Sequence, residues 1–206
     1  MAKSSYRVPF SGRAHHYSEA EIETVTEIMQ QANPLTQGHY LRQFEADFCR
    51  YTGAAHSLGV CNATAALELS AQMCQFEPGD EVIIPAHTYT SSAYPFIKAG
   101  AKPVWADIDL TTRVMTVDTI RPLITQRTRA IVVVHLYGYG VDMKPICELA
   151  QENGIIVIED AAQALGVRVD GRHVGTFGDF GVFSFHSHKN MSTLGEGGML
   201  TTKKKL

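Results

Sequence analysis

Residues 130–159, AIVVVHLYGYGVDMKPICELAQENGIIVIE, contain two apolar runs separated by a segment with the pattern of a helix. The runs AIVVVHL (130–136) and IIVIE (155–159) are apolar at successive positions, so strands formed by them would bury both of their faces. Such strands are typical of a sheet that helices cover on both sides. With a helix expected over 142–153, this stretch predicts a β–α–β unit.

The same alternation continues along the chain on both sides of this unit. We expect further strands over residues 57–61, 81–85, 102–106, 180–185 and 197–202, and further helices over residues 63–76, 91–99 and 117–124. The repeated pattern predicts the α/β fold class, with three α/β/α layers around a mostly parallel seven-stranded sheet.

The N-terminal part of the chain is expected to be helical. Ser18 and Glu21 have the spacing of a capping box, which predicts that a helix begins there. A second amphipathic helix is expected over 41–51. We therefore expect residues 1–40 to form an N-terminal helical segment and residues 41–206 to form the main, ligand-binding domain.

Composition narrows the class of protein. The chain has 206 residues, 45% of them hydrophobic and 19% charged, with a formal net charge of −3, which suits one globular domain. It has no basic stripe for nucleic acid, no apolar run long enough to span a membrane and no signal-peptide core. Its four cysteines are scattered, which favours reduced thiols and a cytoplasmic location over a disulfide framework or a zinc site.

Ligands of such sheets bind at the carboxyl ends of the strands, so the residues that follow each strand are candidate site residues. The turn at Ala63 and Thr64 opens a helix whose N–H groups could hold a phosphate, although small residues there also serve packing alone. Tyr89 could stack on a planar ligand, the alternative being a buried tyrosine with its hydroxyl satisfied. Asp160 ends an apolar strand, where it could pair with a protonated pyridine nitrogen or cap a following helix. Gln163 would then share a helical face with it.

The stretch SFHSHKNMSTLGEGG (184–198) follows the sixth expected strand and contains one lysine. Lys189 is a candidate Schiff-base nucleophile, and the alternative is a solvated loop lysine. Ser184 is a second candidate phosphate ligand or an ordinary strand serine. A phosphate cradle, a stacking aromatic ring, a buried acid and an amine together match the needs of pyridoxal 5′-phosphate (PLP).

The motif EDAAQALG (159–166), followed by GTFGDFGVFSF (175–185), Lys189 and GEGG (195–198), resembles the DegT/StrS-type sugar aminotransferases, which are PLP enzymes of fold type I. The resemblance covers nearly the whole chain. It implies that Lys189 forms the Schiff base with the cofactor and that the other site residues bind that cofactor. Their implied roles are Asp160 at the ring nitrogen, Gln163 at the ring hydroxyl, Tyr89 on the ring face, and Ser184 with Ala63 and Thr64 at the phosphate.

The chain departs from this family in three respects. Its phosphate turn reads Ala63-Thr64 where the family usually has Gly-Thr, and His186 stands where a tyrosine is common, which leaves the role of His186 open. Family members also continue into a C-terminal small domain. We therefore expect a truncated large domain, with the small domain missing, that binds PLP weakly and turns over little.

The resemblance implies transfer of an amino group from glutamate or glutamine to a nucleotide-linked keto-sugar or a keto-cyclitol. Lys189 would move the proton, and the active site would lie at the interface of a homodimer. Two alternatives remain. A metal-dependent hydrolase could use His186 and His188 with Asp160, although we expect no metal, and a truncated or regulatory relative could bind PLP without catalysis.

Overall fold

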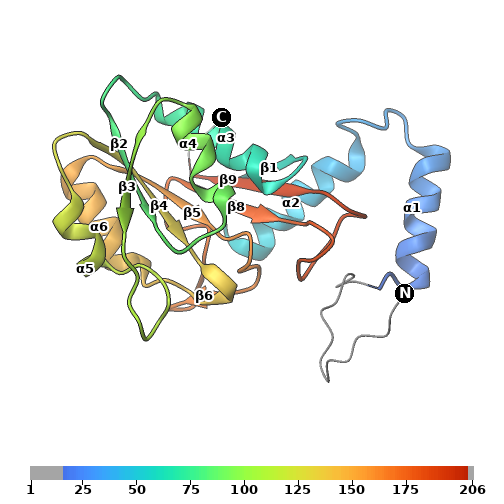
Figure 1. Cartoon of the computed structure of the whole chain (residues 1–206). Coiled ribbons are helices and arrows are strands. Elements are labelled where there is room, and N and C mark those ends of the chain that lie inside the picture. The colour runs from blue at the N-terminus through green and yellow to red at the C-terminus, as the bar shows by residue number, and fades with distance from the viewer. Residues whose placement is uncertain (1–15, 204–206) are drawn as a thin grey trace, which may run out of the picture.

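The structure, a computed structural model, describes residues 16–203 (Figure 1). Residues 1–15 of the expected N-terminal segment and residues 204–206 lie outside the described part. The helices are α1 (Glu19–Gln31), α2 (His39–Thr52), α3 (Ala63–Cys74), α4 (Tyr94–Lys98), α5 (Val117–Ile120) and α6 (Met143–Asn153), with short 3-10 helices η1 (Thr90–Ser92), η2 (Arg121–Leu123) and η3 (Leu136–Gly138). The strands are β1 (His56–Val60), β2 (Glu81–Pro85), β3 (Lys102–Ala106), β4 (Thr128–Val134), β5 (Ile156–Asp160), β6 (Arg168–Val169), β7 (Arg172–His173), β8 (Phe180–Ser184) and β9 (Gly198–Thr202).

The central sheet has seven strands in the order β1-β9-β8-β5-β4-β2-β3. Strand β9 is antiparallel to both of its neighbours, and the other adjacent pairs are parallel. The predicted α/β class and mostly parallel seven-stranded sheet are therefore confirmed. Helix α3 packs against α4, and α5 packs against α6. Parallel crossovers are right-handed as a rule, and the chain moves along the sheet in opposite directions before and after β3, so the two pairs lie on opposite faces of the sheet and give the three layers of Figure 1.

Several boundaries differ from the sequence-based expectation for local reasons. The expected strand 130–136 ends at Val134, because residues 136–138 turn into η3. The expected helix 91–99 is divided into η1 and α4, with Pro95 near the start of α4. Residues 161–166 form turns, so no helix follows Asp160, and the small β6–β7 hairpin was not expected.

Helix α1 begins where its sequence predicts, and α2 begins at His39, two residues before the expected start. The Ser18 side chain accepts from the Glu21 N–H, and the Glu21 carboxylate accepts from the Ser18 N–H at 2.7 Å, which completes the capping box. Helix α1 has no buried residue, whereas α2 buries Phe48 against the sheet. The division of the chain at residue 40 stays a prediction.

The strands of the core are buried on both faces. Every residue of β2 is buried, as is every residue of β4 except Arg129. On β8, the ring of Phe183 packs edge-on against that of Phe48 in α2, with centroids 4.9 Å apart. Successive strand residues face opposite sides, so Ser184 points to the face on which α3 packs. The fold thus directs Ser184 toward the start of α3.

Within residues 16–203, no helix combines the length and the apolar composition that a membrane crossing requires. All four cysteines are free thiols, and they differ in exposure: Cys61 is exposed and Cys147 is half-buried. Burial raises the pKa of the Cys147 thiol to about 11, and the negative charge of Glu159 adds to the rise.

This difference predicts selective alkylation. A thiol whose pKa is near 11 carries almost no thiolate at pH 8, so iodoacetamide should modify Cys61 and spare Cys147. Mass spectrometry of the digested protein measures both sites, and the same reaction in urea is the control, because unfolding exposes Cys147. Equal rates at the two cysteines in the folded protein would contradict the assigned environment of Cys147.

Candidate active site

A cavity of about 670 Å³ opens at the carboxyl ends of the parallel strands. All seven residues proposed from the sequence line it, together with polar residues that the sequence did not single out. The predicted set is Ala63, Thr64, Tyr89, Asp160, Gln163, Ser184 and Lys189. The structure therefore brings these residues to one place, while the role of each stays a prediction.

One wall of the cavity is the N-terminus of α3. The Asn62 side chain caps this helix by accepting from the Ala65 N–H at 2.9 Å. The first N–H groups of a helix, here those of Ala63 and Thr64, have no partner within the helix, so they remain available to an anion. The Thr64 hydroxyl donates to the Ser91 hydroxyl at 3.0 Å, which leaves the Ser91 proton free to point toward a ligand.

Gly198 fixes the distance between this wall and Ser184. In the sheet, Gly198 is paired with Ser184 of β8 on one side and with Val60 of β1 on the other. A Cβ at Gly198 would lie 2.5 Å from the Asn62 carbonyl carbon and 2.8 Å from the Ala63 nitrogen. Glycine therefore lets α3 begin directly over β9. Ser184 lies on the neighbouring strand, about one strand spacing (roughly 5 Å) from Gly198, so the start of α3 stands close to Ser184 across the glycine.

The floor of the cavity is the carboxylate of Asp160, which is 6% exposed. Its Oδ2 accepts from the Ser92 hydroxyl at 2.7 Å, and its Oδ1 accepts from the Ala162 N–H at 3.1 Å. Ser92 is 2.8 Å from the Thr88 hydroxyl in turn. Among residues 16–203, Asp160 forms no ion pair with a lysine or arginine, and no α-helix follows it, so the helix-cap alternative is wrong.

Lys189 is half-buried and lies in a tight turn beyond β8. Its N–H donates to the His186 carbonyl at 2.8 Å, and the Ser187 N–H donates to the Gly195 carbonyl at 2.9 Å. These bonds fold the segment back on itself at the edge of the sheet. The lysine thereby stays beside the cavity instead of extending into solvent as an ordinary loop lysine does.

His186 and His188, the histidines of the alternative metal-dependent hydrolase, lie beyond the end of β8. His186 Nδ1 accepts from the His188 N–H at 3.1 Å, and Nε2 is 3.5 Å from Glu196 Oε1. In the described part of the chain, no group of three or more histidine, cysteine or acidic residues is arranged to hold a metal ion. The bonds of His186 therefore help to shape the turn that contains Lys189.

Tyr89 and Gln163 complete the cavity wall. Tyr89 is 70% exposed, so its ring is available to a ligand and the alternative of a buried tyrosine is wrong. Gln163 Oε1 accepts from the Tyr137 N–H at 2.8 Å. Because this bond fixes which end of the amide is the oxygen, the NH₂ group of Gln163 is the end left to donate to a ligand.

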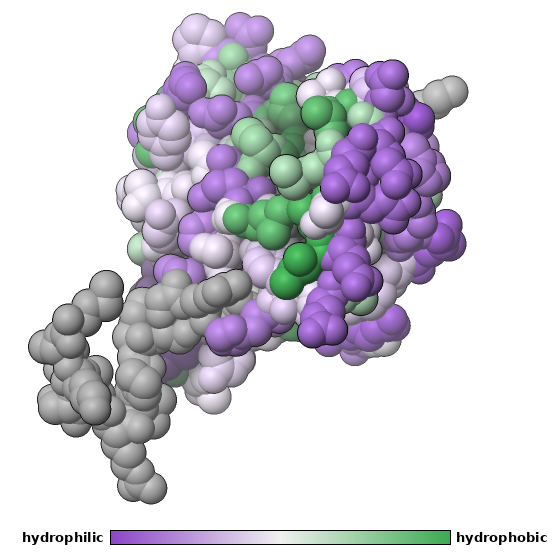
Figure 2. Space-filling model, turned by 90° about the vertical axis from the view of Figure 1, so that its right-hand side faces the viewer, coloured by the Kyte–Doolittle hydropathy of each residue, from purple (hydrophilic) through white to green (hydrophobic). Residues whose placement is uncertain are grey.

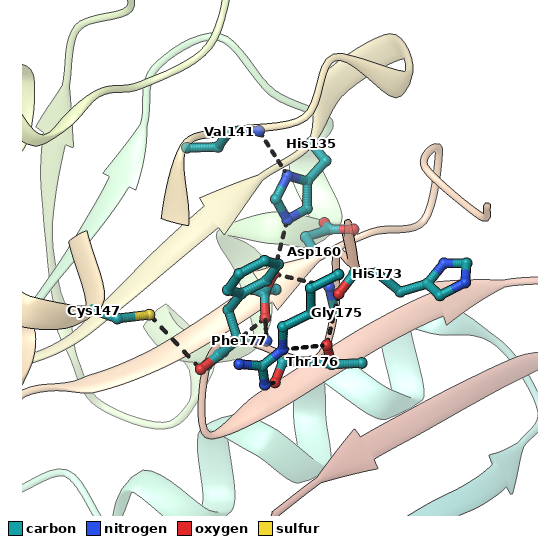
Figure 3. A network of polar contacts seen from close by, with 12 residues as sticks. His135, Val141, Cys147, Asp160, His173, Gly175, Thr176 and Phe177 are labelled. Carbon is teal, nitrogen blue, oxygen red and sulfur yellow. Dashed lines mark hydrogen bonds and ion pairs between the residues drawn. The ribbon is translucent and has the colours of Figure 1, made fainter. Parts of the chain in front are cut away.

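Directly before Asp160, the fully buried carboxylate of Glu159 organises the strand end. Figure 3 shows the surroundings of this strand end, with His135, Gly175 and Phe177 labelled. It accepts from the N–H groups of Gly175, Phe177 and Gly178 at 2.8, 2.6 and 2.7 Å. It also lies 3.1 Å from Nε2 of the buried His135. His135 Nδ1 accepts from the Val141 N–H at 3.1 Å, so the ring proton sits on Nε2 and is donated to Glu159.

Four residues of the site and its support were not expected from the sequence: Ser91, Ser92, Glu159 and His135. For the serines a signal was present, because the run TYTSSA (88–93) brings several hydroxyl groups to a strand end. For Glu159 the signal was an acid at the end of an otherwise apolar run. Its partners, however, come from residues 16–19 positions further along and from a different strand, which no local pattern indicates.

The sequence profile of the DegT/DnrJ/EryC1/StrS aminotransferase family matches residues 15–205. A UDP-N-acetyl-3-dehydro-α-D-glucosamine 3-aminotransferase of Acidithiobacillus ferrooxidans is 40% identical over 95% of this chain and 53% of its own length. A pleiotropic regulatory protein of Geobacillus stearothermophilus is 37% identical over 95% of this chain and 53% of its own. The chain thus spans about half the length of the curated relatives that it matches.

Among solved structures, the chain is similar to a protein of Streptococcus pneumoniae assigned as a sugar aminotransferase, in its PLP form. The TM-score is 0.88 at 33% identity, over 97% of this chain and 54% of that one. The same protein is also similar in its pyridoxamine phosphate (PMP) form.

Glu159 provides a test of the buried network. In Glu159→Gln, an NH₂ group must face backbone N–H groups or His135 Nε2–H, so at least one buried donor loses its acceptor. We expect the free energy of unfolding to fall by about 2–4 kcal/mol, measured by urea denaturation. Glu152→Gln, an exposed change in α6, is the matched control and should alter it by under about 0.5 kcal/mol. Similar effects of the two changes would show that Glu159 does not organise the strand end.

Proposed function

Because the chain belongs to the DegT/DnrJ/EryC1/StrS aminotransferase family, we propose that it provides the cofactor-binding domain of a PLP-dependent aminotransferase that acts on sugars. The observation that carries this proposal is the pairing of two groups in one cavity. A buried carboxylate without an ion-pair partner in the described chain, Asp160, forms its floor, and the half-buried amine of Lys189 lies at its wall. We assign this role to residues 41–206.

The residues of the cavity fit PLP. The phosphate would be held by the N–H groups of Ala63 and Thr64 and by the hydroxyls of Ser184 and Ser91, with the close approach at Gly198 keeping these groups around one space. Lys189 would hold the aldehyde carbon. Residues at the other positions would contact the ring, with Tyr89 on its face, Gln163 at its hydroxyl and Asp160 at its nitrogen.

When bound, the cofactor supplies an electron-withdrawing ring that stabilises negative charge at the carbon losing a proton. Asp160 would hold the proton on the ring nitrogen, since Ser92 and Ala162 keep its carboxylate oriented as an acceptor. Lys189 Nζ would remove the proton from the amino donor and return it to the product. The cavity wall limits the directions from which water reaches this nitrogen.

We propose glutamate or glutamine as the amino donor and a nucleotide-linked keto-sugar as the acceptor, with a keto-cyclitol as the other candidate acceptor. The name of the Acidithiobacillus ferrooxidans relative, a 3-aminotransferase of a UDP-linked keto-sugar, supports the nucleotide-linked choice. A cavity with several hydroxyl, amide and imidazole groups also suits a polyhydroxylated substrate. Separate half-reactions with each donor and each acceptor would distinguish these candidates.

We also propose that the chain works as a homodimer in the cytoplasm. Figure 2 shows the side of the molecule that lies at the right in Figure 1. On this face, hydrophobic residues gather in the middle and hydrophilic residues surround them. Exposed apolar side chains occur beside the cavity at Tyr89 and elsewhere at Tyr94 and Ile97 of α4. Such surface favours association with a second copy. The four free thiols favour a reducing compartment.

A second candidate function is that of a regulatory relative that binds PLP without catalysis. The similarity to the regulatory protein of Geobacillus stearothermophilus favours it. Both candidate functions need the cofactor at Lys189, but only the aminotransferase moves a proton of the amino donor. The two experiments that follow separate these steps.

The first prediction concerns the lysine. After incubation with PLP and reduction with borohydride, peptide mapping should find the added mass on Lys189, because this amine lines the cavity with the phosphate-binding groups. Lys189→Ala should abolish the label, whereas Lys98→Ala, a change at an exposed lysine of α4, should leave it in place. A label confined to any other lysine refutes the proposed site.

The second prediction concerns the acid. Asp160→Asn keeps the shape and still accepts from the Ala162 N–H, but it carries no negative charge to hold the ring proton. Deuterium exchange at the α-carbon of glutamate should slow by about 100-fold or more, while labelling of Lys189 persists. The exposed Asp142→Asn is the control. No α-carbon exchange in the unaltered protein, together with normal labelling of Lys189, would favour the regulatory candidate.

A further inference from the structure

The segment that contains Lys189 is contacted by a residue from the opposite end of the chain. Tyr17 directly precedes α1, the helix that stands apart from the sheet at the right of Figure 1. Its hydroxyl oxygen accepts from the Leu194 N–H at 3.0 Å and lies 3.1 Å from the Ser192 hydroxyl oxygen. In the contact with Ser192, either hydroxyl can be the donor.

The other side of this segment is held by the end of the sheet. The Thr193 N–H donates to the Phe185 carbonyl at 3.1 Å, and the Thr193 hydroxyl donates to the Glu196 carbonyl at 2.9 Å. His186 holds the start of the turn that contains Lys189, because its carbonyl accepts from the Lys189 N–H and its Nδ1 accepts from the His188 N–H. Tyr17 supplies the contact from outside, so the segment 190–194 is fixed from two directions.

Leu194 has a backbone conformation that needs such support. Its φ is +65°, in the left-handed region that side-chain-bearing residues rarely adopt. The next residue is Gly195, where the chain turns back toward the sheet. A hydrogen bond from the Leu194 N–H to a fixed acceptor stabilises this conformation against ordinary alternatives, and those alternatives would change the course of the segment that follows Lys189.

We propose that Tyr17 is a positioning residue for Lys189: through Ser192 and Leu194, its hydroxyl keeps the lysine segment in the form that presents the amine to the cavity. The importance of Lys189 rests on the proposed function, whereas the contact with the segment does not. Tyr17 does not line the cavity, and it acts only through the segment that it holds. The N-terminal segment thus becomes part of the apparatus that orients the lysine.

The test is hydrogen–deuterium exchange of the whole chain, measured by mass spectrometry on peptides covering residues 190–198. Tyr17→Phe keeps the ring and removes only the hydroxyl, so exchange at the Leu194 amide should rise about tenfold. Tyr51→Phe, at an exposed tyrosine of α2, is the matched control and should leave these peptides unchanged. Ser192→Ala removes one partner and should have a smaller effect, and adding it to Tyr17→Phe should add little, because both changes break the same contact.

The second measurement is the rate at which PLP with borohydride labels Lys189. It should fall about tenfold in Tyr17→Phe, because the amine is presented to the cavity for a smaller fraction of the time, and stay constant in Tyr51→Phe. Unchanged exchange in Tyr17→Phe overturns the proposal, as does faster exchange with an unchanged labelling rate. If even the unaltered protein takes no label at Lys189, the proposed function fails, and the exchange result alone decides whether Tyr17 holds the segment.

Discussion

The end of β5 depends on one buried carboxylate. Glu159 lies in a fully buried position, where an ion is tolerated only if its oxygens are satisfied. Three backbone N–H groups of residues 175–178 and the Nε2–H of His135 meet that requirement. The same bonds tie the loop before β8 to the ends of β4 and β5. They therefore fix the strand end at which the next residue, Asp160, enters the cavity.

The two adjacent acids at the end of β5, Glu159 and Asp160, consequently lie in different surroundings. Successive residues of a strand point to opposite faces, so Glu159 and Asp160 cannot share partners. Glu159 faces a loop of the protein and has its acceptors filled by it. Asp160 faces the cavity and keeps acceptor capacity beyond its bonds to Ser92 and Ala162. Glu159 thus holds the end of the strand in place, and Asp160 keeps an acceptor position on the side of the cavity.

How far the sequence predicts this arrangement depends on how local each cause is. The apolar runs of β4 and β5 require two covering layers, and capping residues such as Ser18 mark helix starts, so the fold class follows from short patterns. Asp160 and Lys189 are recognisable because they stand at strand ends. Ser92 could not be assigned as a partner of Asp160, since the two lie 68 residues apart. The sequence left open whether a helix follows Asp160, and the chain forms turns there.

Glycine and tyrosine set the remaining geometry from opposite sides. Gly198 matters because it has no side chain: any side chain there would push α3 away from β9 and separate the N–H groups of its first turn from Ser184. Tyr17 matters because its hydroxyl offers the Leu194 N–H an acceptor that the local chain does not provide. Gly198 begins β9 and Leu194 lies just before it, so both constraints act on the chain between Lys189 and the sheet. The position of the amine relative to the start of α3 is thus determined at the two ends of one short segment.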